Sequence, residues 1–403
     1  MNCQYLLSDI TLHEDDLMDE AKDQFDFHTT ILNLFELNRQ VVVENDQVTD
    51  IGRHLLLSKL EKAHTTFKEV LNYIVSQNVL SKCSLPEFGP IFVCGLPRTG
   101  STLLYNLLAC DPNCRAPFTT DMSGECLPPI SRSNTEEHER RKSMLAQEQQ
   151  FCENLLDRQS MLAASHPSYL IEEDFLILEH AGIFIPVMRI SPTYRTLVDT
   201  FYYNEIYRGA VYKYHKLFLS MLNSVDKPCS HWLVKAPEHS FSLNIILRQY
   251  TKSAFIMTHR KLEDVLPSHN RSAWAFENIY FDKNDQTKKD LITMNGLRYI
   301  DKMIDHIMKF RLDRIKKDEE LDKNIFDVLY DDLIKEPIVT VRRIYTHFGL
   351  RWTQEFETAM YTWLRDNPQG KQGRHTYNLS DIGLTREDIE SRFAPYIHLF
   401  LRS

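Results

Sequence analysis

The feature that most constrains this sequence is a short apolar run that leads into a loop with spaced glycines. Residues 91–94 read I-F-V-C, residues 95–102 read G-L-P-R-T-G-S-T, and residues 103–109 read L-L-Y-N-L-L-A. The first run is typical of a buried parallel strand, and the last is typical of a helix, which Asp111-Pro112 would end. A strand, a glycine loop and a helix in this order predict a phosphate-binding loop.

The loop has the glycine spacing of loops that bind nucleoside triphosphates, G-x-x-x-x-G-K-(S/T), but it lacks their lysine. Gly95 and Gly100 match the two glycines, whereas Ser101 stands where the lysine would be. In kinases and nucleotide hydrolases that lysine reaches the β- and γ-phosphates, which Mg²⁺ bridges. Arg98 and the hydroxyls of Ser101 and Thr102 can still bind a phosphate or sulfate group, together with backbone N–H groups.

Three further apolar runs are typical of buried strands, namely residues 231–234, 254–257 and 325–329. Since strands that alternate with helices pair in parallel, the sequence predicts an α/β fold, a P-loop-type parallel sheet flanked by helices on both faces. The helices are expected at residues 134–160, 170–225 with breaks, 239–250, 286–316 and 337–349.

The residues before the first strand have a different pattern. Apolar residues recur at helical spacing within residues 1–88, as in L-L-L-S-K-L at 55–60, and Pro86, Gly89 and Pro90 then interrupt it. We therefore expect a helical N-terminal extension at residues 1–88 and one α/β domain at residues 89–403.

Composition argues against several classes of function. The net charge of −9 argues against general binding to nucleic acid or to an anionic membrane. The start of the chain has no basic region followed by an apolar one, and no apolar run is long enough to span a bilayer, so the sequence predicts a soluble, cytoplasmic protein. None of the 8 cysteines forms a C-x-x-C pair, so no metal site is expected.

The loop G-L-P-R-T-G-S-T-L resembles the 5′-phosphosulfate loop of sulfotransferases that use 3′-phosphoadenosine-5′-phosphosulfate (PAPS), which varies around P-(K/R)-(S/T)-G-(S/T)-T. The resemblance implies that the phosphosulfate is held by Arg98, Thr99, Gly100, Ser101 and Thr102. It also implies that PAPS is the co-substrate and that no metal takes part.

Two further segments resemble the part of these sulfotransferases that binds the rest of the donor. In the family, an arginine at the end of a strand and a serine about two helical turns later bind the 3′-phosphate, and Arg260 and Ser268 match them in F-I-M-T-H-R-K-L-E-D-V-L-P-S. The segment D-V-L-Y-D-D-L-I-K-E-P resembles D-V-x-Y-x-D-L-x-x-D-P of the bacterial-type family. Within it, Tyr330 is expected either near the adenine or in packing.

The segment H-W-L-V-K-A-P-E-H resembles L-K-(S/T)-P-x-H of the bacterial-type family and, more distantly, K-D-P of tyrosylprotein sulfotransferases. The resemblance implies that Lys235 contacts the oxygen that bridges phosphate and sulfate. The tail N-P-Q-G-K-Q-G-R-H-T-Y-N-L-S-D-I-G-L resembles the N-P-x-G-x-x-G-R-H-x-Y-x-L-x-D-F-G-L ending of the same family. It implies that Gly373 and Arg374 cover the phosphate and adenosine of the donor.

The residue that removes the acceptor's proton is left open by the sequence. Family members with R-x-P-L-x-W-E carry a glutamate where this chain, in R-A-P-F-T-T-D, has Asp121. Glu173, in an acidic run, and His166 are alternatives, and Asp121 could instead cap a helix.

The sequence therefore predicts a PAPS-dependent sulfotransferase acting on a hydroxyl or amine of a small-molecule, glycan or lipid acceptor. A P-loop kinase or nucleotide hydrolase is the alternative, because I-F-D-V-L-Y-D-D could hold Mg²⁺. A non-catalytic member of the sulfotransferase family that only binds nucleotide is the second alternative. Neither the acceptor nor the oligomeric state is indicated.

Overall fold

The computed structural model describes residues 12–156, 170–191, 203–282, 286–316, 323–368 and 378–401. Its sheet contains four parallel strands in the order β2-β1-β3-β4. The predicted strands and the P-loop-type α/β fold are confirmed, although β2 begins at Leu233 rather than at residue 231. The strands are β1 Ile91–Gly95, β2 Leu233–Lys235, β3 Ala254–His259 and β4 Ile325–Leu329.

Side chains of the strands alternate between two hydrophobic cores, one on each face of the sheet. Phe92 of β1 and Met257 of β3 belong to one core, whereas Val93 and Ile256 belong to the other. Strands that are buried on both faces are nearly continuous in apolar residues, which explains why β1 and β3 were recognisable in the sequence.

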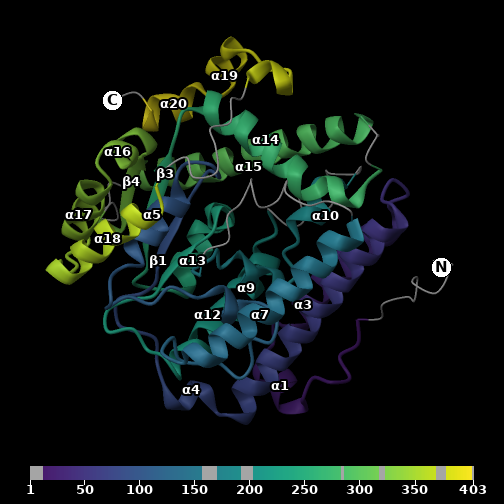
Figure 1. Cartoon of the computed structure of the whole chain (residues 1–403). Coiled ribbons are helices and arrows are strands. Elements are labelled where there is room, and N and C mark those ends of the chain that lie inside the picture. Colours follow the sequence, from purple (N-terminus) through teal and green to yellow (C-terminus); the bar gives the residue numbers. More distant parts are fainter. Residues whose placement is uncertain are drawn as a thin grey trace.

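The smaller core lies under α5, α17 and α18, which flank the sheet together with α16 (Figure 1). These helices span Ser101–Leu108, Pro337–His347, Gln354–Asp366 and Tyr330–Lys335. Each presents apolar side chains to the sheet, such as Leu104 from α5 and Val341 from α17. α5 therefore runs directly from the loop after β1 over this face, as the sequence predicts.

The larger core joins the other face of the sheet to a thick helical layer (Figure 1). Phe67 of α3 and Phe218 of α12 belong to the same hydrophobic cluster as Phe92 and Phe255 of the sheet. The N-terminal helices α2, His28–Glu44, and α3, Asp50–Ser76, are thus part of this layer. Their helical character was predicted from spacing, and the boundary at residue 88 stays a prediction.

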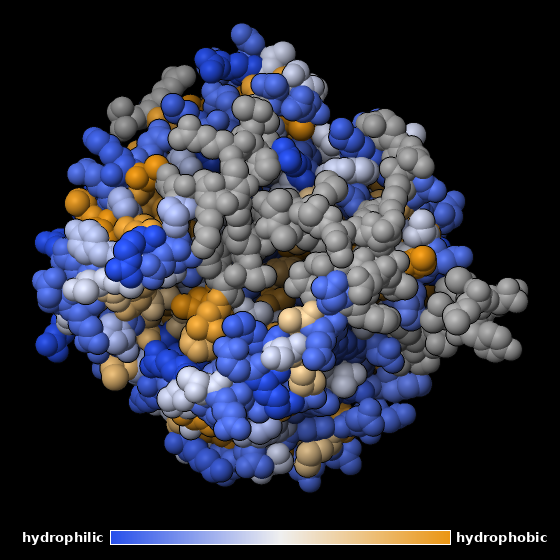
Figure 2. Space-filling model, in the orientation of Figure 1, coloured by the Kyte–Doolittle hydropathy of each residue, from blue (hydrophilic) through white to orange (hydrophobic). Residues whose placement is uncertain are grey.

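The remaining described helices complete these layers. Within the described ranges, none of the helices has the length and apolar content needed to cross a membrane. Figure 2 shows a mostly hydrophilic surface on one face, with scattered hydrophobic residues. The remaining helices are α1 Asp19–Gln24, α4 Val79–Lys82, α6 Thr119–Met122, α7 Thr135–Leu156, α9 Phe175–His180, α10 Ile185–Ile190, α12 Glu205–Asn223, η2 Pro237–Phe241, α13 Leu243–Gln249, α14 Leu262–Glu277, η3 Asn278–Tyr280, α15 Gln286–Lys316, η5 Leu379–Ile382, α19 Arg386–Arg392 and α20 Ala394–Phe400.

Candidate active site

The loop between β1 and α5 uses backbone conformations that explain its glycines. Gly95 and Gly100 have φ values of 112° and 85°, in the left-handed region. A Cβ atom at Gly95 would also lie 2.5 Å from the carbonyl oxygen of Thr258. Arg98 has a φ of 66° although it is not a glycine. Such a conformation costs about 1–3 kcal/mol and is concentrated at functional sites.

Thr99 anchors this loop to the sheet. It is fully buried, and its hydroxyl donates to the carbonyl oxygen of Leu96 at 2.6 Å. The same hydroxyl lies 2.5 Å from the hydroxyl of Thr258 in β3. The side chain of Thr99 therefore points into the protein and holds the loop. Its hydroxyl is occupied, so Thr99 can offer a ligand only its backbone N–H.

The structure brings the predicted donor-site residues Arg98, Ser268 and Arg260 together. Nε of Arg98 donates to Oγ of Ser268, at 3.1 Å, and Nη1 of Arg260 donates to the carbonyl oxygen of Arg98, at 3.2 Å. Ser268 lies on α14, which follows β3, and Arg260 leaves the carboxyl end of that strand. Two guanidinium groups thus meet at one loop, which is an arrangement suited to a multiply charged anion.

Tyr330 packs against the same loop. Its ring lies under the guanidinium of Arg260, 4.1 Å from the ring centre. A Cβ atom at Gly100 would approach the ring carbon Cδ2 to 3.0 Å. Tyr330 therefore orients Arg260 through a cation–π contact and lies against the second glycine of the loop.

Lys235 and Glu173 meet at the start of α5. The side chain of Lys235 is only 1% exposed, and its Nζ forms an ion pair with Oε1 of Glu173, whose side chain is 25% exposed. Nζ also lies 3.4 Å from the hydroxyl of Thr102. A buried ammonium group, a carboxylate and a loop hydroxyl are thus gathered at the carboxyl end of β2, where parallel sheets bind their ligands.

Asp174, next to Glu173, is held by a buried network that sequence reasoning missed. Its carboxylate accepts hydrogen bonds from Nε2 of His215, at 2.7 Å, and of His239, at 3.0 Å. Tyr250 and Tyr212 donate to the other ring nitrogens, both at 2.7 Å. Burial opposes ionisation of Asp174, but the two histidines outweigh burial and hold its pKa below its ordinary value.

This network positions the segment that carries Glu173. The backbone N–H of Asp174 donates to the carbonyl oxygen of Lys235, at 3.2 Å, which ties residues 173–174 to the end of β2. The histidines come from α12 and η2, far away in the sequence. An acidic run such as E-E-D gives no signal of such partners, which is why only Glu173 was singled out.

Asp121 lies in a different environment from that of Glu173. Its side chain is fully buried, and its Oδ2 pairs with Nη2 of Arg115 at 2.6 Å. Oδ2 also accepts a hydrogen bond from the backbone N–H of Phe118, at 2.7 Å, at the start of α6. Arg115 also pairs with a second carboxylate, because its Nε lies 2.8 Å from Oδ2 of Asp226. Among the described residues, Asp121 thus bonds to Arg115 and Phe118 rather than to Lys235 or the loop.

Glu238, three residues after Lys235, is a further acidic group that sequence reasoning missed. Its Oε1 accepts a hydrogen bond from the hydroxyl of Tyr299 at 2.5 Å. Burial, followed by the negative charge of Glu173, raises the pKa of Glu238 to about 7, although Tyr299 and Arg189 act in the opposite direction. The protonated carboxyl is therefore the favoured form of Glu238 in the folded protein at slightly acidic pH.

We expect Glu238→Gln to stabilise the protein increasingly as the pH rises. In the unfolded chain a glutamate has a pKa of about 4.3, below that of the buried Glu238. Between pH 5 and 8 the free energy of unfolding of the wild type therefore falls by up to about 3 kcal/mol, whereas the amide variant does not titrate and loses none of it. Urea unfolding at pH 5 and pH 8 measures this difference. Glu205→Gln, at an exposed ion pair with Arg248, is the control. An equal difference at the two pH values would contradict the prediction.

Three predicted residues, His166, Gly373 and Arg374, lie outside the described residues. Their predicted roles stay predictions.

Comparison with known proteins identifies the family. The model of the sulfotransferase family matches residues 90–354, from β1 past α17. The chain belongs to the sulfotransferase family. It is therefore an enzyme of sulfuryl transfer, and the kinase alternative is not favoured.

Several proteins similar to this sulfotransferase come from mycobacteria. The omega-hydroxy-beta-dihydromenaquinone-9 sulfotransferase Stf3 is 24% identical over 315 residues, covering 74% of this chain and 72% of Stf3, in both Mycobacterium bovis and Mycobacterium tuberculosis. The crystal structure of sulfotransferase STF9 from Mycobacterium avium is similar with a TM-score of 0.75 and 23% identity, over 98% of both chains. The crystal structure of sulfotransferase STF1 from Mycobacterium tuberculosis is similar with a TM-score of 0.67 and 21% identity, over 94% of both chains. The two structures share the fold of this chain.

Proposed function

We propose that this sulfotransferase moves the sulfuryl group of PAPS to a hydroxyl or amine of a small-molecule, glycan or lipid acceptor, without a metal. The observation that carries the proposal is the meeting of Arg98, Ser268 and Arg260 at the loop after β1. These residues come from two strand ends and one helix, and together they supply two fixed positive charges and a hydroxyl.

The donor would lie along this loop. The backbone N–H groups at the start of α5, with Arg98, Ser101 and Thr102, would hold the 5′-phosphosulfate, because helix N-termini and guanidinium groups both favour oxyanions. Arg260 and Ser268 would bind the 3′-phosphate. Since Arg98 and Ser268 bond to each other at 3.1 Å, they would exchange this partner for the donor's oxygens.

Two further contacts with the donor are proposed, one from packing and one from the family resemblance. Tyr330 would orient Arg260, on which it packs, and would lie near the adenine. Gly373 and Arg374 would cover the phosphate and adenosine, as the family resemblance implies.

In the transfer step, the acceptor's oxygen or nitrogen forms a bond to sulfur while the bond from sulfur to the bridging oxygen breaks. The electron pair of that bond leaves with the phosphate. Nζ of Lys235 would stabilise the negative charge on the leaving oxygen, and Glu173 would take the acceptor's proton. The ion pair between Lys235 and Glu173 supports this division, because both groups face one point near Thr102. The pairing of Asp121 with Arg115 supports a structural role for Asp121.

The relative Stf3 is named for omega-hydroxy-beta-dihydromenaquinone-9 as its acceptor. It supports a lipid alcohol as the acceptor class to examine first here.

Calorimetry with 3′-phosphoadenosine-5′-phosphate, the expected product, and separately with ATP and Mg²⁺, tests the donor. We expect the bisphosphate alone to bind tightly, and transfer of label from PAPS to persist in a chelator. Preferential binding of Mg·ATP would refute the proposal. Binding of the bisphosphate without transfer to any acceptor would leave a non-catalytic member of the family.

Arg260→Ala is expected to weaken binding of the bisphosphate by about 10- to 100-fold, since a hydrogen bond to a charged group contributes about 1.5–3 kcal/mol. Titration calorimetry measures this loss. Lys261→Ala is the matched control, because the neighbouring lysine is exposed and its removal changes the net charge equally. Unchanged affinity in Arg260→Ala would remove this residue from the donor site.

A further inference from the structure

A small cavity lies between α9, α10, α12 and η2. Its volume of about 30 Å³ would hold about two water molecules or a small polar group at the end of a chain. Leu178, Met188, Val211 and Phe241 form apolar walls, whereas Arg208 and Glu238 bring ionisable groups to it.

Three buried polar atoms at this cavity have no hydrogen-bond partner within the described part of the chain. Arg208 is only 9% exposed, and its Nε and Nη1 form no hydrogen bond within the described part of the chain. The same holds for Oε2 of Glu238, whereas its Oε1 is bonded to Tyr299. Buried donors and acceptors are nearly always paired, and an unpaired one destabilises the protein. Two side chains with unpaired groups at one cavity are therefore available to a ligand.

The cavity adjoins the proposed centre of transfer. Glu238 follows Lys235 by three residues, and the charge of Glu173 contributes to its raised pKa. Tyr212, which also lines the cavity, bonds to His239, and His239 bonds to Asp174, the neighbour of Glu173. A molecule that occupies the cavity would thus be close to the proposed catalytic groups.

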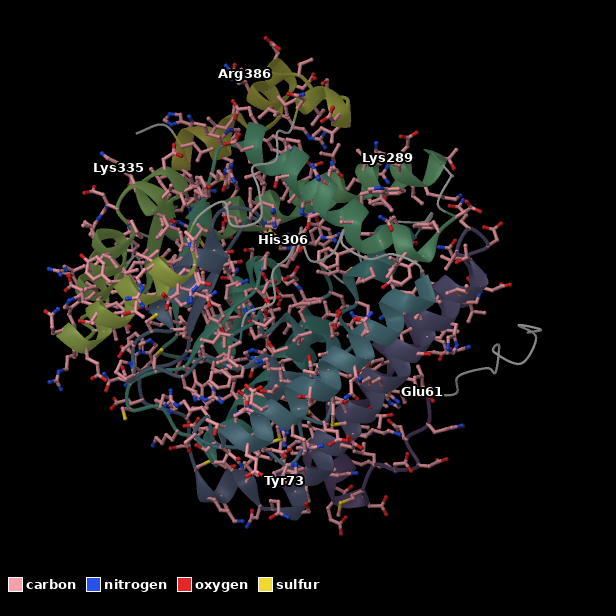
Figure 3. The ribbon with its side chains drawn as sticks, in the orientation of Figure 1. Glu61, Tyr73, Lys289, His306, Lys335 and Arg386 are labelled. Carbon is pink, nitrogen blue, oxygen red and sulfur yellow. The ribbon has the colours of Figure 1, made fainter. Side chains whose placement is uncertain are left out.

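A series of aromatic rings leads from the cavity to the surface. Phe241 contacts the ring of His306 with the centres 5.3 Å apart, and His306 stacks on Tyr203 at 5.0 Å. Tyr203 is 44% exposed, and the nearby Ile206 is 73% exposed. His306 lies near the middle of the view in Figure 3. In the same orientation, Figure 2 shows a hollow with hydrophobic residues in the middle of the molecule.

We propose that this cavity and the aromatic path bind the acceptor, and that the acceptor is apolar and carries a carbonyl oxygen that Arg208 and Glu238 hold. The proposal rests on the proposed sulfuryl transfer and names the acceptor's class. Two guanidinium nitrogens of Arg208 have N–H groups without a partner, and the protonated carboxyl of Glu238 offers an O–H, so an oxygen that only accepts hydrogen bonds fits between them. The apolar walls and rings would bind the chain of the acceptor.

Two probes of similar length test the proposal, 1-hydroxydecan-2-one and decan-1-ol, of which only the first has a carbonyl, beside its hydroxyl. Their dissociation constants are measured by calorimetry in the presence of 3′-phosphoadenosine-5′-phosphate. We expect the wild type to bind the hydroxyketone at least tenfold more tightly than the alkanol. We expect Arg208→Met, which keeps length but removes the donors, to reduce this ratio to less than threefold.

Controls separate this proposal from the donor site and from misfolding. Arg248→Met, at an exposed pair with Glu205, should keep the wild-type ratio. Affinity for the bisphosphate reports on the donor site and on folding, and it should be unchanged in Arg208→Met. If that variant does not fold, Arg208→Lys is used instead. It keeps the positive charge but not the two adjacent N–H groups of the guanidinium, and it should also lower the ratio.

Equal binding of the two probes by the wild type, or no binding of either, would overturn the proposal and leave the cavity as a site for structural water. An unchanged ratio in the folded Arg208 variants would overturn it too. Failure of the wild type to bind the bisphosphate would instead refute the proposed donor, whatever the ratio of the probes.

Discussion

Lys235→Ala is expected to lower the rate of sulfuryl transfer by about 100- to 1,000-fold, the effect of removing one group that stabilises transition-state charge. The physical reason is the position of Nζ, which is buried, lies 3.4 Å from the hydroxyl of Thr102 and faces Glu173. In such a site a charge acts with little screening by water. Single-turnover transfer from labelled PAPS measures the rate without interference from product release.

The affinity of Lys235→Ala for 3′-phosphoadenosine-5′-phosphate should stay within about threefold, because the group is proposed to act on charge that appears during transfer. Lys252→Ala, which removes an exposed lysine paired with Glu87, is the control. A rate close to that of the wild type would exclude Lys235 from the leaving-group role. A large loss of affinity with an unchanged rate would make it a binding residue.

Asp121→Ala is expected to destabilise the protein by about 3–5 kcal/mol, because it leaves the guanidinium of Arg115 buried with only part of its charge compensated. Both side chains of this pair are at most 1% exposed. Chemical denaturation measures the free energy of unfolding. Glu148→Ala breaks an exposed pair with Lys62 and should cost less than about 1 kcal/mol. A loss below 1 kcal/mol for Asp121→Ala would contradict the structural role.

The same series separates the two candidate bases. Glu173→Gln should lower the transfer rate of the folded enzyme, in addition to any stability lost because the buried Nζ of Lys235 no longer faces a carboxylate. Asp121→Asn should lower stability and leave the rate of the folded enzyme close to that of the wild type. The reverse pattern would return Asp121, rather than Glu173, to the role of base.

Those parts of the fold that depend on neighbours in the sequence could be predicted. The strands buried on both faces, the glycine loop and the helix after it all have local patterns, and the structure contains each of them. The positions of Arg260 and Ser268 came from a family motif, and their contacts with Arg98 could not be derived from it. They depend on the order of the strands, which places β3 beside β1.

Contacts between distant segments had no signal in the sequence. Glu173 and Lys235 were both predicted as site residues, but their ion pair could not be predicted. One residue precedes α12 in the sequence and the other follows it. The network of Asp174 with His215 and His239 was missed because buried histidines have no characteristic spacing. The cavity at Arg208 was missed as well, because an unpaired side chain is recognised only when its surroundings are known.

The larger core has a consequence for how this enzyme folds during synthesis. It contains Leu17 from the beginning of the chain, strand residues such as Phe92 and Phe255, and Phe400 from the end. The apolar faces of α2 and α3 therefore leave the ribosome before α12, on which both pack, and long before the parts of the core in α15 and α20 exist. Because contacts so distant in sequence form slowly and exposed apolar surface aggregates, we expect newly made chains to depend on chaperones until translation ends.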